Sequence, residues 1–361
     1  MIYLDANASE PLRPEARAAA LAALDLTGNP ASVHGAGRAA RACLEDARER
    51  LAARFGTPAQ EVVFTSGATE ALAQAIAALG AGRRVIVGAT EHPAVFAAAA
   101  GAAILPVDGR GVADLAALEA LLTHGGPALV ALMAANNETG TLQPLAEAAA
   151  LCHRHGALLL ADAAQAAGRV ALDCGALGAA AVVVSGHKMG GPAGAGALLL
   201  GPGGSALAPL IGGGGQERGR RGGTPGLAAI AGMAAAADAA RPGEAMAGWR
   251  AEIERAAVAA GAVVIGAGAA RLANTTCLGL PGVAAQTQVI ALDLAGFAVS
   301  AGAACSSGKI ARSHVLAAMG CGVLAGEAIR VSLPWNATAA AVAAFAEAYG
   351  AMAAGSSRRA A

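Results

Sequence analysis

Short runs of apolar residues alternate with longer amphipathic segments along the first two thirds of the chain. Runs of four to six mostly apolar residues are typical of buried strands, whereas the longer segments predict helices. The predicted strands are residues 61–65, 84–88, 103–107, 128–132, 157–161, 179–184 and 197–200. The predicted helices are residues 37–55, 71–79, 114–122, 145–155 and 227–239. This alternation favours an α/β fold with a mostly parallel, helix-covered sheet of seven strands.

The pattern changes near Arg241-Pro242-Gly243, beyond which strands are fewer and shorter. Helices are predicted over residues 244–260, 286–294, 313–319 and 337–348, with short strands near Val263, Thr276, Phe297 and Val331. Few elements in mixed order predict a second, small α+β domain. With 361 residues, the chain is long enough for two domains.

A lysine and an aspartate each follow a predicted strand. Lys188 ends the segment Ser185-Gly186-His187-Lys188, and Asp162 directly follows strand 157–161. Ligands of open α/β sheets bind beyond the carboxyl ends of the strands, so these two side chains can share one site. Pyridoxal phosphate (PLP) needs both, because a lysine amine condenses with its aldehyde and a carboxylate keeps its ring nitrogen protonated. A surface lysine with its stem along apolar residues is the alternative.

The turn Ser66-Gly67-Ala68-Thr69-Glu70 joins strand 61–65 to helix 71–79. Backbone N–H groups and the dipole at a helix start form an anion site, to which the dipole contributes roughly 0.3–1 kcal/mol. An ordinary N-cap would have a similar sequence. Together with Lys188 and Asp162, however, the turn predicts a site for the PLP phosphate.

These segments, in this order and spacing, resemble the cysteine desulfurases, PLP enzymes of the class V aminotransferase group within fold type I. The resemblance runs from Tyr3 to about Ser332. It is carried by residues 28–32, 65–70, 91–92, 136–140, 217–219 with 223–224, 300–305 and 329–332, besides the Asp162 and Lys188 segments. It implies a large PLP-binding domain over residues 13–242. Residues 1–12 and 243–361 would form the small domain that carries the catalytic-cysteine loop.

The resemblance also implies a role for each matching residue. Lys188 would bind the PLP aldehyde, Asp162 would partner the ring nitrogen, and His92 would stack on the ring and move protons. Gln165 and Asn137 would bond near the ring hydroxyl, and Asn137 would also hold substrate. The phosphate would contact Ala68, Thr69, Ser185 and His187, together with Thr224 of the neighbouring subunit in a homodimer. Arg330 would clamp the carboxylate of L-cysteine, a role that suits a planar guanidinium, although an ion pair is the alternative.

Cys305 is the residue that would set this group apart from ordinary aminotransferases. The resemblance makes it the nucleophile that takes sulfur from L-cysteine as a persulfide and so releases L-alanine. Its neighbours over residues 301–308 are small, which suits a mobile, accessible thiol, and Lys309 and Arg312 would lower its pKa below about 8.5. The remaining cysteines form no Cys-x-x-Cys pair or zinc spacing and are expected to be reduced, buried side chains: Cys43, Cys152, Cys174, Cys277 and Cys321.

Composition and charge exclude several classes of partner. The 25 basic and 25 acidic residues balance, so nothing recommends nucleic acid or an anionic membrane. The charge-free stretch 189–216 holds three prolines and many glycines, which argues against a spanning helix despite a mean hydropathy of +0.53. No export signal precedes the matching region, so a cytoplasmic location is expected. The basic cluster at residues 218–221, just before Thr224, predicts a dimer interface beside a phosphate.

Three functions remain open from the sequence. The first is conversion of L-cysteine to L-alanine, with sulfur passed from Cys305 to an iron–sulfur scaffold or another sulfur acceptor protein. The second is another PLP reaction, such as selenocysteine lysis or amino transfer, and the third is a non-catalytic sulfur-relay subunit. Two departures from the family pattern, Asn7 and the pair Pro334-Trp335, leave a substrate role for Asn7 and the shape of the pocket rim open.

Overall fold

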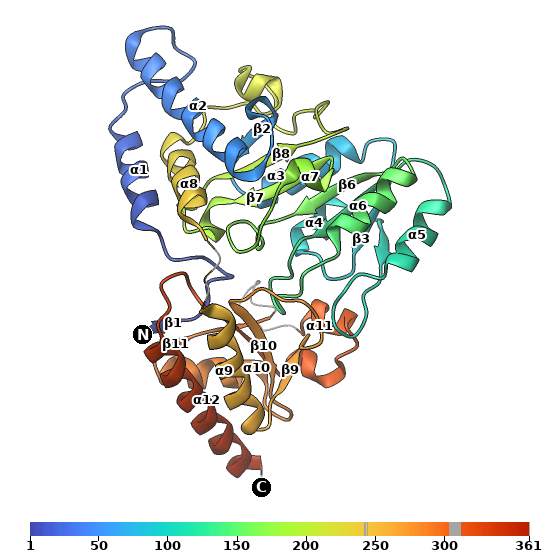
Figure 1. Cartoon of the computed structure of the whole chain (residues 1–361), viewed down its shortest axis with the longest axis vertical. Helices are drawn as coiled ribbons and strands as arrows, with labels where there is room; N and C mark the ends of the chain where they lie inside the picture. Colours follow the sequence, from blue (N-terminus) through green and yellow to red (C-terminus); the bar gives the residue numbers. More distant parts are fainter. Residues whose placement is uncertain (242, 244, 303–311, 361) are drawn as a thin grey trace.

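A seven-stranded sheet forms the larger part of the molecule (Figure 1). The structure, a computed structural model, describes residues 1–241, 243, 245–302 and 312–360, of which 356–360 are described as backbone only. The strands of this sheet are β2 (Val62–Thr65), β3 (Arg84–Gly88), β4 (Ala103–Leu105), β5 (Ala128–Met133), β6 (Leu158–Asp162), β7 (Ala181–Ser185) and β8 (Gly196–Leu200). Their spatial order is β2-β8-β7-β6-β5-β3-β4, and only β8 runs against the others. The predicted seven-stranded, mostly parallel sheet is confirmed.

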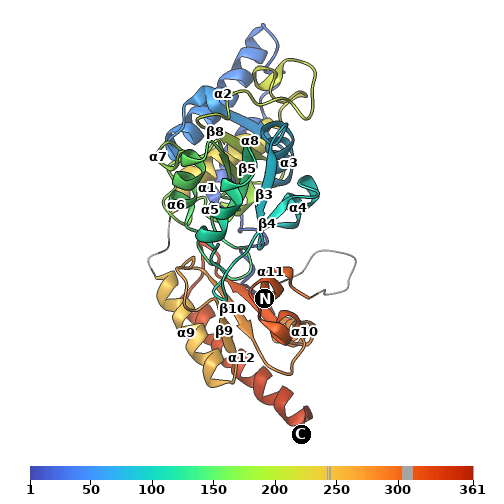
Figure 2. The same ribbon diagram turned by 90° about the vertical axis from the view of Figure 1, so that its right-hand side faces the viewer.

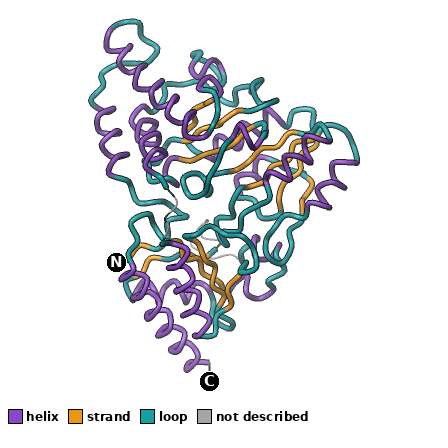
Figure 3. Tube along the Cα trace, in the orientation of Figure 1, coloured by secondary structure: helices purple, strands orange, loops and turns teal. Residues whose placement is uncertain are grey.

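Helices cover both faces of this sheet, as the tube in Figure 3 shows. They are α1 (Pro14–Leu24), α2 (Gly35–Phe55), α3 (Ala68–Leu79), α4 (Pro93–Ala98), α5 (Leu115–Thr123), α6 (Leu145–Arg154), α7 (Cys174–Leu177) and α8 (Leu227–Ala239). Side chains alternate along each strand: Val62 and Phe64 pack in the core that includes α2, α6 and α8, whereas Val63 packs with α3. Because both faces are covered, the strands are continuous apolar runs.

The C-terminal part has its own sheets and core, at the end of the molecule away from α2 (Figure 2). Its strands are β9 (Val263–Ile265), β10 (Thr275–Gly279), β11 (Phe297–Ala298), β12 (Ser300–Ala301) and β13 (Ala328–Ser332). Its helices are α9 (Met246–Ala259), α10 (Ala285–Leu294), α11 (His314–Ala318) and α12 (Ala339–Ala360). An antiparallel sheet has the order β12-β13-β10-β9, and β11 pairs with β1 (Ile2–Tyr3). Leu4 packs in this second core, so the first residues of the chain lie with its last third.

Four helices differ clearly from the sequence prediction. Helices α1, α4 and the four-residue α7 were not predicted. Helix α1 is rich in alanine and buries only Ala16 and Ala23, so its sequence has little contrast between faces. Helix α12 continues to Ala360 instead of ending near residue 348, because Tyr349 and Ala353 pack in the second core. Among the described residues, no helix is long and apolar enough to cross a bilayer.

Candidate active site

The parallel strands bring the predicted site residues to one edge of the large sheet. Asp162 is the last residue of β6, and Lys188 lies three residues beyond the end of β7. These two strands are neighbours, with Asp162 paired to Val183. Asn137 follows β5, which is the neighbour of β6 on its other side. The sequence argument that strand ends would gather these side chains therefore agrees with the observed topology.

The amine of Lys188 lies among backbone carbonyls and positive charges. Its Nζ donates to the carbonyl oxygens of Asn7 and of Ala8, the latter at 3.0 Å. Burial, together with the charges of Arg330 and Arg169, lowers the pKa of Lys188 to about 8, against the opposing effect of Asp5 and Asp162. Far more of this amine is therefore uncharged near neutral pH than of an ordinary lysine, as a nucleophile requires.

The carboxyl group of Asp162 is buried at the bottom of the same site. One of its oxygens accepts the N–H of Ala164 at 2.9 Å. Burial raises the pKa of Asp162, and this bond and the charge of Lys188 act in the opposite direction. Asp162 is thus a carboxylate with few competing partners, which suits a partner for a protonated ring nitrogen.

A second carboxyl group, Glu91, lies close enough to Asp162 for the two charges to interact. Glu91 belongs to the matching segment 91–92, but no role was predicted for it. Glu91 is fully buried, and its Oε1 accepts the N–H of Met133 at 2.7 Å. Its Oε2 has no hydrogen-bond partner among the described residues. Burial raises the pKa of Glu91 well above its usual value, with Asp162 adding to the effect. Only the full burial of this acid distinguishes it, and burial is not visible in the sequence.

His92 is the N-cap of α4, and it is exposed. Its Nδ1 accepts the N–H of Ala94 at 3.1 Å, which leaves Nε2 to carry the proton of the neutral ring. Desolvation lowers the pKa of His92, and the charges of Lys188 and His314 lower it further. The ring is therefore neutral at physiological pH.

The start of α3 supplies the predicted phosphate turn. Gly67 is its N-cap, and no side chain caps the helix, so its first N–H groups remain available. A Cβ on Gly67 would meet no atom within 4 Å, which leaves open space over these donors. Ala68 and Thr69 begin the helix. An open, uncapped helix start fits a phosphate group.

Ser185 is the last residue of β7, and His187 lies in the turn that follows it. Ser185 is buried, and His187 Nδ1 lies 3.4 Å from Ser9 Oγ. Burial lowers the pKa of His187 to about 4, with Lys188 and Arg169 contributing. This ring is therefore a neutral hydrogen-bonding group.

Gln165 and Asn137 behave differently from one another. The side-chain amide of Gln165 is engaged: Nε2 donates to Asn7 O at 2.9 Å and Oε1 accepts from Arg169. The side chain of Asn137 has no recorded hydrogen bond within the described part of the chain, and its backbone oxygen accepts from Arg330. Asn137 is thus available to a ligand, whereas the predicted contact of Gln165 with the ring hydroxyl would require its present bonds to change.

Arg330 lies in β13 and reaches the site from the C-terminal part. Its Nη2 is 2.6 Å from Asp5 Oδ1, and its Nη1 donates to Asn137 O at 3.1 Å. Its buried Nε has no partner among the described residues. The alternative of an ion pair for Arg330 is therefore realised, but in a buried position and with donors left over for a carboxylate.

Cys305, the predicted nucleophile, lies outside the described residues, as does Lys309. The flanks of that segment are described, and both lie against Glu138, the residue after Asn137. Ser313 Oγ donates to Glu138 Oε2 at 2.6 Å, and a Cβ on Gly302 would meet the same oxygen at 2.2 Å. Gly302 and Ser313 therefore both lie next to Glu138.

Thr224 lies in the loop before α8, close to the phosphate turn of the same chain. It lines a cavity of about 100 Å³ with Thr65, Ser66 and Arg221. Arg221 Nε donates to Glu70 Oε1 at 2.9 Å, and Glu70 Oε2 accepts from Ser66. The contact of Thr224 with a neighbouring subunit stays a prediction.

Asn7 is the residue whose role the sequence left open, and it is a buried hub. Its carbonyl accepts from Lys188 and Gln165, its Oδ1 accepts from Arg169 at 2.8 Å, and its Nδ2 donates to Asn137 O at 3.0 Å. Its N–H donates to Ser332 Oγ at 3.0 Å. The N-terminal segment thus contacts the Lys188 amine directly, through the carbonyl groups of Asn7 and Ala8.

The five cysteines outside the proposed catalytic segment are free thiols. Cys152, Cys174 and Cys277 are buried, and burial raises the pKa of Cys152 and Cys174 to about 12 and raises that of Cys277 as well. Such thiols are unreactive. No group of metal-ligating side chains occurs in the described ranges.

Comparison with known proteins identifies the family. The pattern described as aminotransferase class-V matches residues 2–345, and the chain belongs to this family. A protein from Cereibacter sphaeroides named cysteine desulfurase is 41% identical over 94% of this chain and 92% of its own length. The chain therefore belongs with the cysteine desulfurases inside that family, as the sequence motifs predicted.

Solved structures of similar proteins support the same family assignment. A NifS-like protein from Rickettsia africae superposes with a TM-score of 0.88 at 31% identity, covering 98% of this chain and 99% of its own. A structure described as SspA in complex with cysteine has a TM-score of 0.81 at 28% identity, covering 92% and 99%. The predicted PLP fold type I is confirmed by these neighbours.

Proposed function

We propose that the chain converts L-cysteine to L-alanine with bound PLP and receives the sulfur atom on Cys305. The observation that carries this proposal is the placement of a buried amine of lowered pKa, Lys188, beside a buried carboxyl, Asp162, at the ends of neighbouring strands. The similarity to a protein solved in complex with cysteine supports the choice of substrate.

The residues fit PLP at three points. The uncapped start of α3, with open space over Gly67, would hold the phosphate through Ala68 and Thr69, helped by Ser185 and His187. Thr224 of a partner subunit would complete this contact. Asp162 would keep the ring nitrogen protonated and Lys188 would bind the aldehyde. When bound, PLP supplies an electron sink for the bonds at the substrate α-carbon.

The chain's own residues would position the substrate and move protons. Arg330 would hold the carboxylate of L-cysteine with the donors that Asp5 and Asn137 leave free, and the side chain of Asn137 would add a hydrogen bond. Once free, the Lys188 amine accepts a proton near pH 8 and below, so it can carry one to or from the α-carbon. The neutral ring of His92 would cover the cofactor, and Gln165 would reach its hydroxyl.

Transfer of sulfur from the bound cysteine to Cys305 needs no external oxidant. The thiolate of Cys305 attacks the sulfur of the bound cysteine, the carbon–sulfur bond breaks, and a sulfur–sulfur bond forms. Protonation of the carbon side completes L-alanine. A thiol reductant then releases the sulfur as sulfide, or an acceptor such as an iron–sulfur scaffold protein takes it.

We further propose the predicted domains: residues 13–242 for the cofactor, and 1–12 with 243–361 for delivery of the thiol. The packing of Leu4 with the C-terminal core supports this division. The working form would be a homodimer in the cytoplasm.

Purified protein loaded with PLP and supplied with L-cysteine and a thiol reductant tests the proposal. We expect L-alanine and sulfide in equal amounts, lost in Lys188→Ala and retained in Lys309→Arg, which keeps the positive charge at position 309. Pyruvate or another keto acid in place of alanine would indicate a different PLP reaction. Alanine formed with selenocysteine alone would indicate a lyase, and no product from either would contradict catalysis.

A further inference from the structure

Two buried arginines flank Lys188, and each is paired with a carboxylate from the first ten residues of the chain. Arg330 pairs with Asp5 at 2.6 Å, and Arg169 Nη2 pairs with Glu10 Oε2 at 3.0 Å. Both arginines lower the pKa of Lys188. Asp5 and Arg330 belong to the proposed substrate site, whereas Glu10 and Arg169 do not, and their pairing has no assigned role.

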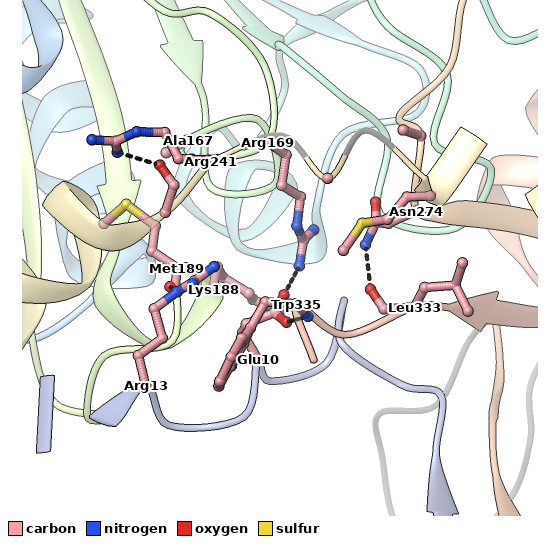
Figure 4. A pocket seen from close by; sticks show the side chains of 15 residues that line it. Glu10, Arg13, Ala167, Arg169, Lys188, Met189, Arg241, Asn274, Leu333 and Trp335 are labelled. Carbon is pink, nitrogen blue, oxygen red and sulfur yellow. Dashed lines mark hydrogen bonds and ion pairs between the residues drawn. The ribbon is translucent and has the colours of Figure 1, made fainter. Parts of the chain in front are cut away.

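Glu10 joins three separate parts of the chain at this point (Figure 4). Its side chain is 6% exposed, and besides Arg169 it accepts the backbone N–H of Trp335 at 2.6 Å through Oε1. Its own N–H donates to the carbonyl of His187 at 2.9 Å, one residue before Lys188. Glu10 therefore connects the segment after β6, the lysine turn and the segment after β13.

The ring of Trp335 is held against the same N-terminal segment. Its Nε1 donates to Pro11 O at 2.9 Å, and the guanidinium of Arg13 lies over the ring at 5.0 Å. Arg13 Nε in turn donates to Met189 O at 2.8 Å, on the other side of Lys188. The departure Pro334-Trp335, unexplained by the family pattern, thus has a structural role. Trp335, Arg13 and Met189 line a cavity of about 30 Å³ together with Lys188.

We propose that Glu10 is a positioning residue for Lys188, which compensates the charge of Arg169 beside the amine and clamps the Trp335 segment beneath it. An arginine stays charged when buried, so without a carboxylate its charge acts on whatever cation is nearest. The charge of Arg169 acts on the protonated nitrogen of Lys188 in this way. Glu10 then lets Arg169 hold Asn7 and Gln165 in place while it limits the effect of the Arg169 charge on the protonated amine.

The charged and titratable groups around Lys188 are few and come from every side. Arg330 and Arg169 are cationic, Asp5 and Asp162 oppose them, and His92 and His187 are held neutral by burial and by Lys188. Arg13 and Arg241 line the same cavity as Glu10 and Arg169, and the charges of the other three residues act on Arg13. Removing the charge of either Glu10 or Arg169 therefore changes the net charge around Lys188 by one.

The test compares the pH dependence of the absorbance of bound PLP, and of alanine formation, in four variants. Glu10→Gln keeps the shape and removes the carboxylate charge, so the transition moves to lower pH, by about 0.5–1 pH unit. Arg169→Gln leaves Glu10 without its cation and moves it to higher pH. The double variant Glu10→Gln/Arg169→Gln returns it close to that of the parent protein. Glu15→Gln, an exposed carboxylate five residues further on, leaves it unchanged.

This inference rests on the proposed function, but the two fail separately. If the parent protein binds PLP and forms alanine while neither single variant moves the transition by more than about 0.2 pH unit, Glu10 has no such role. Shifts in the same direction in both single variants, with reduced thermal stability, would mean that the pair is only structural. Arg169→Gln gives the sign independently should Glu10→Gln fail to fold. Failure of the parent protein to form alanine refutes the proposed function instead.

Discussion

The buried pair of Arg48 and Glu217 should fix the loop that carries Thr224. Both side chains are 3% exposed, and Arg48 Nη1 and Nη2 lie 2.7 and 2.8 Å from the two oxygens of Glu217. Glu217 also accepts the N–H of Phe64 in β2 at 2.9 Å. Glu217 and Arg218 both have positive φ, at 48° and 58°, a conformation that non-glycine residues adopt only when other contacts enforce it. The pair provides that enforcement.

Replacing Glu217 with Gln leaves the buried charge of Arg48 without its main partner. Removal of one partner from a buried pair destabilises a protein by about 3–5 kcal/mol. Arg48 keeps Glu45 at 3.1 Å and the carbonyl of Val62 at 2.7 Å, so we expect the lower end. A loss of about 3 kcal/mol in a chain of this size lowers the melting temperature by roughly 5 °C.

Thermal unfolding of the PLP-loaded protein, at one protein concentration throughout, measures this effect. The matched control is Glu45→Gln, which removes the other carboxylate on the same arginine. Because Glu45 is 40% exposed, its loss should change stability by no more than about 0.5–1 kcal/mol. A Glu217→Gln protein that melts within about 1 °C of the parent, or a control that is equally destabilised, would refute the reasoning.

Three further changes test the site. Asp162→Asn removes the carboxylate proposed for the ring nitrogen and should lower the rate of alanine formation on the order of 100-fold in a steady-state assay; an unchanged rate would contradict that role. Cys305→Ala should abolish sulfide release but keep the absorbance of bound PLP, whereas Cys321→Ala should keep both; sulfide from the first variant would remove Cys305 from the mechanism. Burial raises the pKa of Glu91 well above its ordinary value, so the neutral form favours folding at low pH, and this contribution is lost as pH rises toward the folded-state pKa. Glu91→Gln should therefore melt increasingly above the parent as pH rises from 5 to 8, and a constant difference would show that Glu91 does not carry this penalty.

The sheet was predictable because its strands are covered on both faces. Strand β3 has the predicted bounds, Arg84–Gly88, because its β-branched run 85–87 lies between an arginine and a glycine. The start of α3 and the whole of α1 were harder, because alanine tolerates both buried and exposed positions. Packing, which only the folded chain provides, decides where such segments begin and end.

The candidate site divides in the same way. Lys188 and Asp162 could be assigned because each lies at a strand end, and topology brings parallel strand ends together. The pairs Glu10–Arg169 and Asp5–Arg330 could not, since their members are 159 and 325 residues apart and neither pattern nor spacing links them. The burial of Glu91 depends equally on the tertiary packing.

Attachment of the cofactor is the most direct test of the central claim, and the sequence makes it decisive because the chain contains two lysines, Lys188 and Lys309. Protein loaded with PLP is reduced with borohydride, digested, and its peptides are weighed. The account predicts one equivalent of reduced cofactor on the peptide with Lys188. Cofactor on Lys309, or on neither lysine, would contradict it.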